Sequence, residues 1–353
     1  MPNVAVHFVL ARRALLRWSE RPSLAPFRAA DPAAAEAFLY GAVAPDAGYW
    51  PGGDRLFSEL AHLWRTGDLA RVLGQSAGDG VGRAYAWGWA SHVLADLEVH
   101  PLINQAHGER VHGSRGRPVS STEDVENHMR LEYGLDVAAA ARHPWVERVR
   151  LRHALPDGVL TSLDDALRAT WGWAPPPAQL AASHRTAAVA VRLGAWSNRV
   201  QGAAWDRRPL SAALRAVGAA FAPPRRWMPR AWNASAAAVA VLAPLPPPAW
   251  LLDEMDAVAE RFAATLDAHR DGDVPALPNH DLITGDAHRP DALPARTTDA
   301  LRQLAARGGF RASTHSGQLE DSVDRTSSVR SGGPGAALAS PASPASADPV
   351  GAS

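Results

Sequence analysis

The chain of 353 residues contains no cysteine. This absence excludes disulfide bonds, thiolate metal sites and a cysteine nucleophile, so histidine and carboxylate side chains are the strong metal ligands that remain. Lysine is absent too, and 36 arginines balance 36 acidic residues. The resulting net charge of zero argues against a protein whose main role is to coat nucleic acid, because such proteins carry a strong basic excess.

Long uninterrupted apolar runs are also missing. The first residues lack the basic start of a signal peptide, and their apolar stretch is interrupted by His7 and closed by Arg12 and Arg13. The most apolar later segment, residues 236–252, contains four prolines, which disfavours a membrane-spanning helix. These features predict a soluble protein with a cytoplasmic location.

Helix signals dominate the chain, whereas alternating strand patterns bounded by turn dipeptides are missing. We therefore predict an all-α fold. The expected helices span residues 31–41, 54–67, 82–100, 121–133, 160–171, 178–200, 210–221 and 250–269.

Several of these boundaries rest on single residues. Asp31 and Asp54 are expected N-caps, and Gly67 is expected to close the helix that Asp54 opens. Pro101 predicts the end of the long apolar helix before it, because the residue preceding a proline avoids the α region. Gly134 predicts the end of a helix that would begin with a capping box at Ser121.

From about Gly308 the composition shifts to serine, glycine, proline and alanine. Such a segment cannot bury enough apolar surface to fold. We therefore predict a helical domain over residues 1–307 and a disordered tail over residues 308–353.

The residues with the clearest chemistry are spaced four apart. His92 and Asp96 lie on one helix face about 6 Å apart, so they can bind one ion, whereas His100 is about 12 Å from His92. This spacing indicates at least two metal ions with Asp96 between them. His128 and Glu132 repeat the spacing on a later helix, and Asp136 continues it beyond Gly134.

A single His–carboxylate pair on a helix is more often an exposed pair than a metal site, and a lone histidine such as His62 is commonly a hydrogen-bonded core residue. Asp96, however, lies in a strongly apolar segment, where a buried carboxylate without a cation is costly. Two such pairs within 45 residues favour a metal centre. Zinc accepts imidazole and carboxylate ligands, and closely spaced metal pairs suit phosphate-ester hydrolysis.

The order of these motifs resembles the zinc-dependent phospholipase C family. The resemblance rests on His7, residues 41–46, His62, the His92-x-x-x-Asp96-x-x-x-His100 series and the His128-x-x-x-Glu132 pair, and it covers about residues 2–136. The family includes secreted bacterial phosphatidylcholine-cleaving enzymes and the catalytic domain of glycosylphosphatidylinositol-specific phospholipase D. Residues 140–310 match nothing in this pattern, so the resemblance does not predict which residues of the pocket select the substrate.

The resemblance implies a multi-helix, phospholipase C- or nuclease-like domain that holds two or three zinc ions (Zn²⁺). Carried over residue by residue, the first ion would take Asp46, His62, His92 and Asp96, and the second would take His100, His128 and Glu132. The third would take His7, a bridging Asp96, and the amine and carbonyl of Pro2 once Met1 is removed. His107, His112 and His143 have no counterpart and are expected to be surface or loop residues.

The function expected from this pattern is a zinc-dependent hydrolysis of phosphodiesters, with a phospholipid-like substrate and transient contact with a membrane surface. Asp46 would orient or deprotonate a metal-activated water, and Tyr49, Trp50 and Trp64 would line an apolar mouth or belong to the ordinary core. Two alternatives stay open. The first is a single-strand nuclease, which the zero net charge disfavours but which the basic loop at Arg110, Arg115 and Arg117 keeps open. The second is a zinc-stabilised helical binding protein without catalytic activity.

Overall fold

The computed structural model describes residues 4–50, 52–78, 80–151, 155–205, 244–287 and 293–309. The expected helix at 210–221 and the expected tail beyond residue 309 lie outside these ranges.

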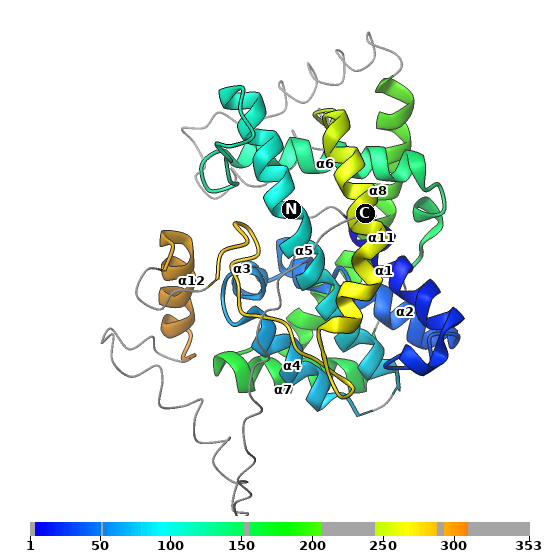
Figure 1. Ribbon diagram of the computed structural model, residues 1–353. Coiled ribbons are helices and arrows are strands. Elements are labelled where there is room, and N and C mark those ends of the chain that lie inside the picture. Colours follow the sequence, from blue (N-terminus) through cyan, green and yellow to red (C-terminus); the bar gives the residue numbers. More distant parts are fainter. Residues whose placement is uncertain are drawn as a thin grey trace, which may run out of the picture. The chain divides into compact units, whose positions relative to one another are not determined.

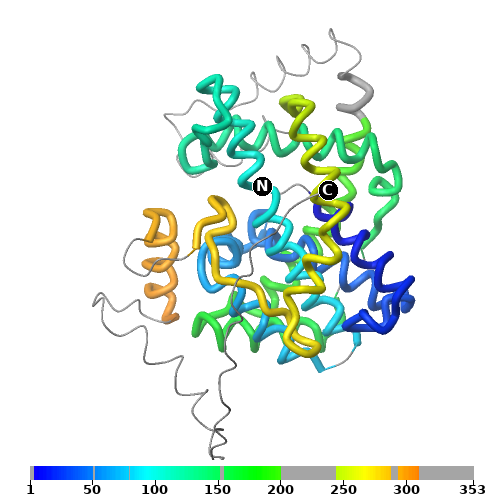
Figure 2. Tube along the Cα trace, in the orientation of Figure 1, coloured from blue at the N-terminus to red at the C-terminus, as the bar shows by residue number. Residues whose placement is uncertain are grey.

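The described chain is almost entirely helical, which confirms the all-α prediction (Figure 1, Figure 2). Its two strands, β1 (Arg270–Asp271) and β2 (Val274–Pro275), form one antiparallel pair with Arg270 opposite Pro275. The helices in chain order are α1 (Val4–Glu20), η1 (Pro22–Leu24), α2 (Pro32–Gly41), η2 (Ala44–Tyr49), α3 (Arg55–Leu63), α4 (Thr66–Ser76), α5 (Gly80–His112), α6 (Val125–Arg142), η3 (Val146–Arg148), α7 (Asp157–Trp171), α8 (Pro177–Trp205), α11 (Ala249–Ala268) and α12 (Ala295–Ala306).

The long helix α5 is the centre of the fold, and α1, α2, α4, α6 and α11 pack against it. Its residues 84–96 are buried on every side, as the all-round apolar sequence predicts. Its closest neighbour is α2, because two glycines bring the backbones together. A Cβ at Gly41 would lie 2.2 Å from the Tyr85 carbonyl oxygen, and a Cβ at Gly88 would lie 2.1 Å from the Phe38 carbonyl oxygen.

The predicted end of this helix at Pro101 is wrong, because α5 continues through Pro101 to His112. The residues beyond the proline are held by tertiary contacts. Ile103 and Ala106 are fully buried, and the Asn104 amide donates a hydrogen bond to the Ile283 carbonyl at 3.0 Å. This packing offsets the one backbone hydrogen bond that proline cannot donate.

The predicted bounds of α6 are also wrong at both ends. The helix begins at Val125 rather than Ser121, with the Asp124 carboxylate accepting the Asn127 N–H as its N-cap. It runs through Gly134 to Arg142. At Gly134 the glycine serves close packing rather than termination, since a Cβ there would lie 1.7 Å from the Leu245 carbonyl oxygen.

The two predicted aspartate N-caps are confirmed, and one predicted stop is not. Asp31 accepts a hydrogen bond from the Ala33 N–H at 2.9 Å, and Asp54 accepts one from the Leu56 N–H at 3.0 Å. The helix that Asp54 opens ends at Leu63, however, and Gly67 lies in the first turn of α4. A Cβ at Gly67 would lie 2.0 Å from the Leu277 carbonyl oxygen, so this glycine allows a segment far along the chain to approach.

The helices α1, α4 and α12 were not among those predicted. In α1 the buried residues Val6, Leu10, Ala14 and Trp18 follow a helical period, so the first described turns of the chain belong to the core. Within the ranges given above, no helix is both long enough and apolar enough to cross a lipid bilayer.

Candidate metal centre

Eight histidine and carboxylate side chains from five elements gather around the middle of α5. All are buried except His100, whose side chain is 12% exposed. They fall into three groups, and within each group the ligand atoms lie within 4.8 Å of one another. The groups are Asp46–His62–His92, His7–His92–Asp96 and His100–His128–Glu132, and the first two share His92.

The group Asp46–His62–His92 joins η2, α3 and α5. The His62 Nδ1 lies 2.7 Å from the Ser58 carbonyl and the His92 Nδ1 lies 3.0 Å from the Ala42 carbonyl, so both Nδ1 atoms carry the proton that these acceptors need. The two Nε2 atoms then face each other at 3.1 Å. Two neutral rings would present two lone pairs to each other there, an arrangement that a cation between them resolves.

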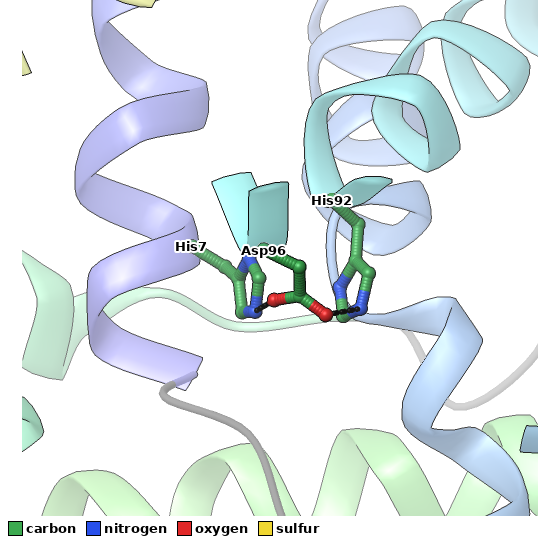
Figure 3. Close-up of side chains that lie close together, drawn as sticks. All are labelled: His7, His92 and Asp96. Carbon is green, nitrogen blue, oxygen red and sulfur yellow. Dashed lines mark ion pairs between the residues drawn. The ribbon is translucent and has the colours of Figure 1, made fainter. Parts of the chain in front are cut away.

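Asp96 lies between the groups. Its Oδ1 is 3.3 Å from the His7 Nε2, and the rings of His7 and His92 stack with centroids 4.1 Å apart beside it (Figure 3). Its Oδ2 is buried, accepts no hydrogen bond, and lies 3.4 Å from the Nε2 atoms of His62 and His92. The same oxygen is 3.9 Å from the His100 Nδ1. This is the intermediate position that the four-residue spacing predicts for a shared carboxylate.

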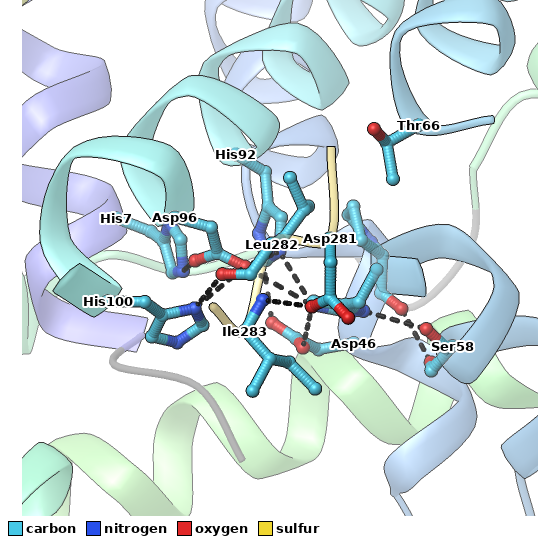
Figure 4. Close-up of polar contacts among 12 residues, drawn as sticks. His7, Asp46, Ser58, Thr66, His92, Asp96, His100, Asp281, Leu282 and Ile283 are labelled. Atoms are coloured by element: carbon cyan, nitrogen blue, oxygen red, sulfur yellow. Dashed lines mark hydrogen bonds and ion pairs between the residues drawn. The ribbon is translucent and has the colours of Figure 1, made fainter. Parts of the chain in front are cut away.

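The third group joins the C-terminal part of α5 to α6. The Glu132 Oε1 lies 2.9 Å from the His128 Nε2 and 3.3 Å from the His100 Nε2. The His100 Nδ1 donates to the Leu282 carbonyl, which directs the Nε2 of this ring toward Glu132 (Figure 4).

Charge in this cluster is strongly coupled. Burial alone would raise the pKa of Asp96, but His100, His92 and His7 hold it well below its usual range. Burial would likewise lower the pKa of His100, but Asp96 and Glu132 raise it to about 9. Asp96 therefore stays ionised and draws positive charge into the site, which metal ions can supply in place of protons.

Asp136, the third member of the later four-spaced series, has a different role. Its Oδ1 accepts hydrogen bonds from the backbone N–H groups of Ala5 and Val6 at 3.1 and 3.2 Å. Burial raises its pKa to about 8, and those two N–H groups act against the rise. Asp136 thus fastens the first turn of α1, and with it His7, to α6.

The segment around Leu282 also contributes to the site, although no sequence motif predicts it. Leu282 donates its N–H to the His62 carbonyl at 2.8 Å and accepts from the His100 ring, so one residue touches both ends of the cluster (Figure 4). Asp281 shapes the turn by accepting the N–H groups of Ile283 and Thr284 at 2.9 and 3.3 Å. The contacts run through the backbone, so no residue type in the sequence marks them.

The segment is also fixed at its start. Thr66 at the beginning of α4 exchanges hydrogen bonds with the backbone of His280, and the Asp68 N–H donates to the Asn279 side chain at 3.0 Å. Residues 279–286 therefore form a strap across the predicted ligands, and we use the name strap for this segment below.

Other candidate residues lie as follows. His107 is not a surface or loop residue as expected, because it is 1% exposed on α5 with its Nε2 3.5 Å from the Asp124 Oδ2. His112 is exposed at the end of α5, and His143 is the C-cap of α6. Pro2 lies outside the described residues, so the N-terminal ligand stays a prediction.

The aromatic residues around the site are divided between core and ring contacts. Trp50 and Trp64 are partly buried and pack on the hydrophobic core, as the core interpretation predicts. The Tyr49 ring lies 5.6 Å from the His62 ring. In the basic loop, the Arg115 guanidinium stacks 4.0 Å from the centre of the Trp250 ring.

Comparison with known proteins agrees with this geometry. A family model described as zinc dependent phospholipase C matches residues 6–171, which confirms the resemblance drawn from the motifs. No curated protein and no solved structure gives a significant match. The matched region carries the pattern of this family and contains the eight clustered side chains, whereas the strap lies beyond it.

Proposed function

We propose that the protein is a zinc-dependent phosphodiester hydrolase that acts on phospholipid-like substrates. The observation that carries the proposal is the position of Asp96, a buried carboxylate with histidine nitrogens from three helices around it and with one oxygen lacking any hydrogen bond. Every ion pair of Asp46 and Asp96 in the described ranges is to a histidine. Such a set fits dications better than it fits a structural ion pair, because no arginine neutralises these carboxylates.

The eight side chains divide the work of binding. One ion would take Asp46, His62, His92 and Asp96, and a second would take His100, His128 and Glu132. His7 with Asp96 would hold a third, together with the amine and carbonyl of Pro2 after removal of Met1. Asp96 would therefore serve more than one ion.

Zinc ions bound here would supply positive charge to the phosphate oxygens and lower the pKa of a coordinated water. The chain's own groups then orient the reaction. The Asp46 Oδ2 is buried and without a hydrogen-bond partner, so it is available to accept a proton from water or to orient that water. The carbonyls of Ser58, Ala42 and Leu282 fix the ring orientations of His62, His92 and His100.

The test combines metal analysis with two substrates. The purified protein is expected to contain two or three zinc ions by mass spectrometry and to hydrolyse a soluble phosphocholine ester, with loss of both on prolonged chelation and recovery on adding zinc. Cleavage of single-stranded DNA without cleavage of the ester would replace the proposal with a nuclease. Full zinc content without turnover of either substrate would leave a zinc-stabilised binding protein. A folded protein that takes up no zinc would contradict all three.

A further inference from the structure

The outer face of α8 carries an apolar stripe that the core does not use. Val189, Leu193 and Trp196 are 44%, 61% and 63% exposed, and they make up three of the five large apolar side chains that are exposed in the described part of the chain. At 100° per residue these three positions fall within about 60° of the helix circumference. They therefore form one continuous strip along about two turns of the helix.

A row of arginines runs beside this strip. Arg185, Arg192 and Arg199 are seven residues apart, are exposed, and lie about 20–60° from Trp196 on the side away from Leu193. The 29 residues of α8 contain no aspartate or glutamate. In a chain of zero net charge, this helix is locally cationic. Among the described residues, only Arg199 of the three arginines has an ion-pair partner, Glu147 at 2.8 Å.

The opposite face of α8 joins the helix to the site-bearing part of the fold. His184, Ala187, Ala188 and Val191 are buried on that face, and α8 contacts both α6 and η2, the elements that carry Glu132 and Asp46. In Figure 1 the α8 label lies beside α6. We define the α8 stripe as Arg185, Val189, Arg192, Leu193, Trp196 and Arg199. Within the part of the chain that the structure describes, no core residue covers its apolar members.

We propose that the α8 stripe docks the protein on the surface of an anionic phospholipid bilayer, an inference that rests on the proposed function for its choice of lipid. A helix lying in the membrane interface presents apolar side chains, tryptophan among them, to the acyl boundary and extends its arginines to the headgroup phosphates. The α8 stripe has both features, because its apolar strip lies beside its row of arginines on the same exposed face of the helix. The positive charge of α8 favours an anionic bilayer surface over a neutral one, because a row of arginines on a helix without acidic residues complements an anionic headgroup layer.

The experiment measures binding to vesicles by flotation, with no turnover needed. The zinc-loaded full chain is mixed with vesicles of phosphatidylcholine alone or of phosphatidylcholine with about one third phosphatidylserine. Binding is expected to favour the anionic vesicles and to weaken with salt. Leu193→Gln and Trp196→Ala should each weaken binding about tenfold, and Arg192→Gln about fivefold.

Matched variants lie elsewhere on the surface. Leu16→Gln removes an apolar side chain that is 45% exposed on α1, and Arg302→Gln removes an exposed arginine on α12. Both should bind vesicles as the unaltered protein does. Equal weakening by these controls, or no weakening by the stripe variants, would overturn the proposal.

Hydrolysis of a soluble phosphocholine ester separates this proposal from the proposed function. The stripe variants should leave that rate unchanged while lowering the rate on anionic vesicles. A protein that binds vesicles through the stripe but hydrolyses neither substrate would support the surface and contradict the function. A protein that hydrolyses the soluble ester but does not bind vesicles would support the proposed function and contradict the lipid-binding surface.

Two other occupants have distinct results. If a second copy covers the stripe, Leu193→Gln would change the sedimentation coefficient and leave vesicle binding unaltered. If residues 206–243 cover it, hydroxyl-radical oxidation of Trp196 would be equally low with and without vesicles. Either result would overturn the lipid proposal, whereas protection of Trp196 only in the presence of anionic vesicles would support it.

Discussion

At Asp96, two carboxylate oxygens lie within 3.9 Å of nitrogens from four histidines, which come from α1, α3 and α5. Glu132 contacts two histidines through one oxygen, and both belong to the third group. The two carboxylates are equally buried, so burial does not distinguish them. What differs is the number of groups that each one joins.

We expect Asp96→Asn to remove more zinc than Glu132→Gln. The amide replaces a charge that offsets two ions in the first case and one ion in the second. The loss should be about two ions against about one, measured by mass spectrometry of the purified proteins. Asp299→Asn, an exposed substitution on α12, is the control. Full zinc content and activity in Asp96→Asn would contradict the sharing of this carboxylate.

The strap gives a second residue-scale prediction, at Asp281. Asp281→Ala removes the acceptor of two backbone N–H groups and so loosens the Leu282 carbonyl that orients His100. Loss of such outer support lowers metal affinity about tenfold. Zinc affinity measured by competition with a chelator should fall by that factor in Asp281→Ala, should be largely restored in Asp281→Asn, and should be unchanged in Asp286→Ala, whose side chain is exposed.

At the scale of the element, replacing a helical glycine by alanine should change the stability of the protein in opposite directions at Gly134 and Gly194. Gly134 in α6 faces the Leu245 carbonyl, whereas a Cβ at Gly194 in α8 would meet nothing within 4 Å. Gly134→Ala should therefore destabilise the protein by at least about 2 kcal/mol, because a backbone must move. Gly194→Ala should stabilise it by about 0.5–1 kcal/mol through helix propensity. Urea unfolding of both variants measures the difference, and equal effects would contradict the packing at Gly134.

The anchoring of α8 to the core depends on pH through His184. Its Nδ1 lies 2.8 Å from the Leu180 carbonyl and its Nε2 lies 2.9 Å from the Tyr85 hydroxyl, and burial lowers its pKa to about 4. In the unfolded chain this imidazole is protonated below about pH 6.5, whereas in the folded chain it stays neutral down to about pH 4. His184 therefore lowers the free energy of unfolding as the pH falls from about 6.5 toward 4.

Between pH 7 and pH 5 the expected loss from His184 is about 2 kcal/mol. His184→Gln should remove this part of the pH dependence, even though the variant is less stable at pH 7. The measurement is the urea unfolding free energy at both pH values, with the exposed His112→Gln as the matched control. An identical slope in His184→Gln and the unaltered protein would show that His184 does not contribute.

Helix caps and periodicity were predictable because they depend on neighbours in sequence. Asp31 and Asp54 cap helices through N–H groups two residues away. The predicted helix ends at Pro101 and Gly134 are wrong because the deciding contacts come from far along the chain. Ile283 accepts a hydrogen bond from Asn104, just beyond the proline, and Leu245 approaches Gly134. Local rules describe what a residue favours by itself, and tertiary contacts decided these two cases.

The candidate site shows the same division. Helix geometry alone brought His92, Asp96 and His100 onto one face and paired His128 with Glu132. The other members, His7, Asp46 and His62, lie singly on separate elements, and only the resemblance to a family connected them. Leu282 could not be found by either route, because its contribution is a backbone carbonyl and a backbone N–H.

For the whole molecule, the sequence predicts that the segment after the last helix is dispensable. The described chain ends with Gly309, whose N–H donates to the Leu304 carbonyl at 3.0 Å and so closes α12. A chain that stops after residue 312 keeps this contact and should match the full protein in melting temperature and zinc content. Calorimetry and metal analysis of the two chains provide the test. A clearly lower melting temperature of the shorter chain would contradict the prediction.

The strap also orders events during synthesis. The side chains of the cluster lie between residues 7 and 132 and so leave the ribosome early, whereas the carbonyl that orients His100 belongs to residue 282 and leaves it after all of them. A nascent chain can collect histidines and carboxylates long before it can hold them in their final orientation. The final orientation of His100 therefore depends on the end of the domain folding back onto its beginning.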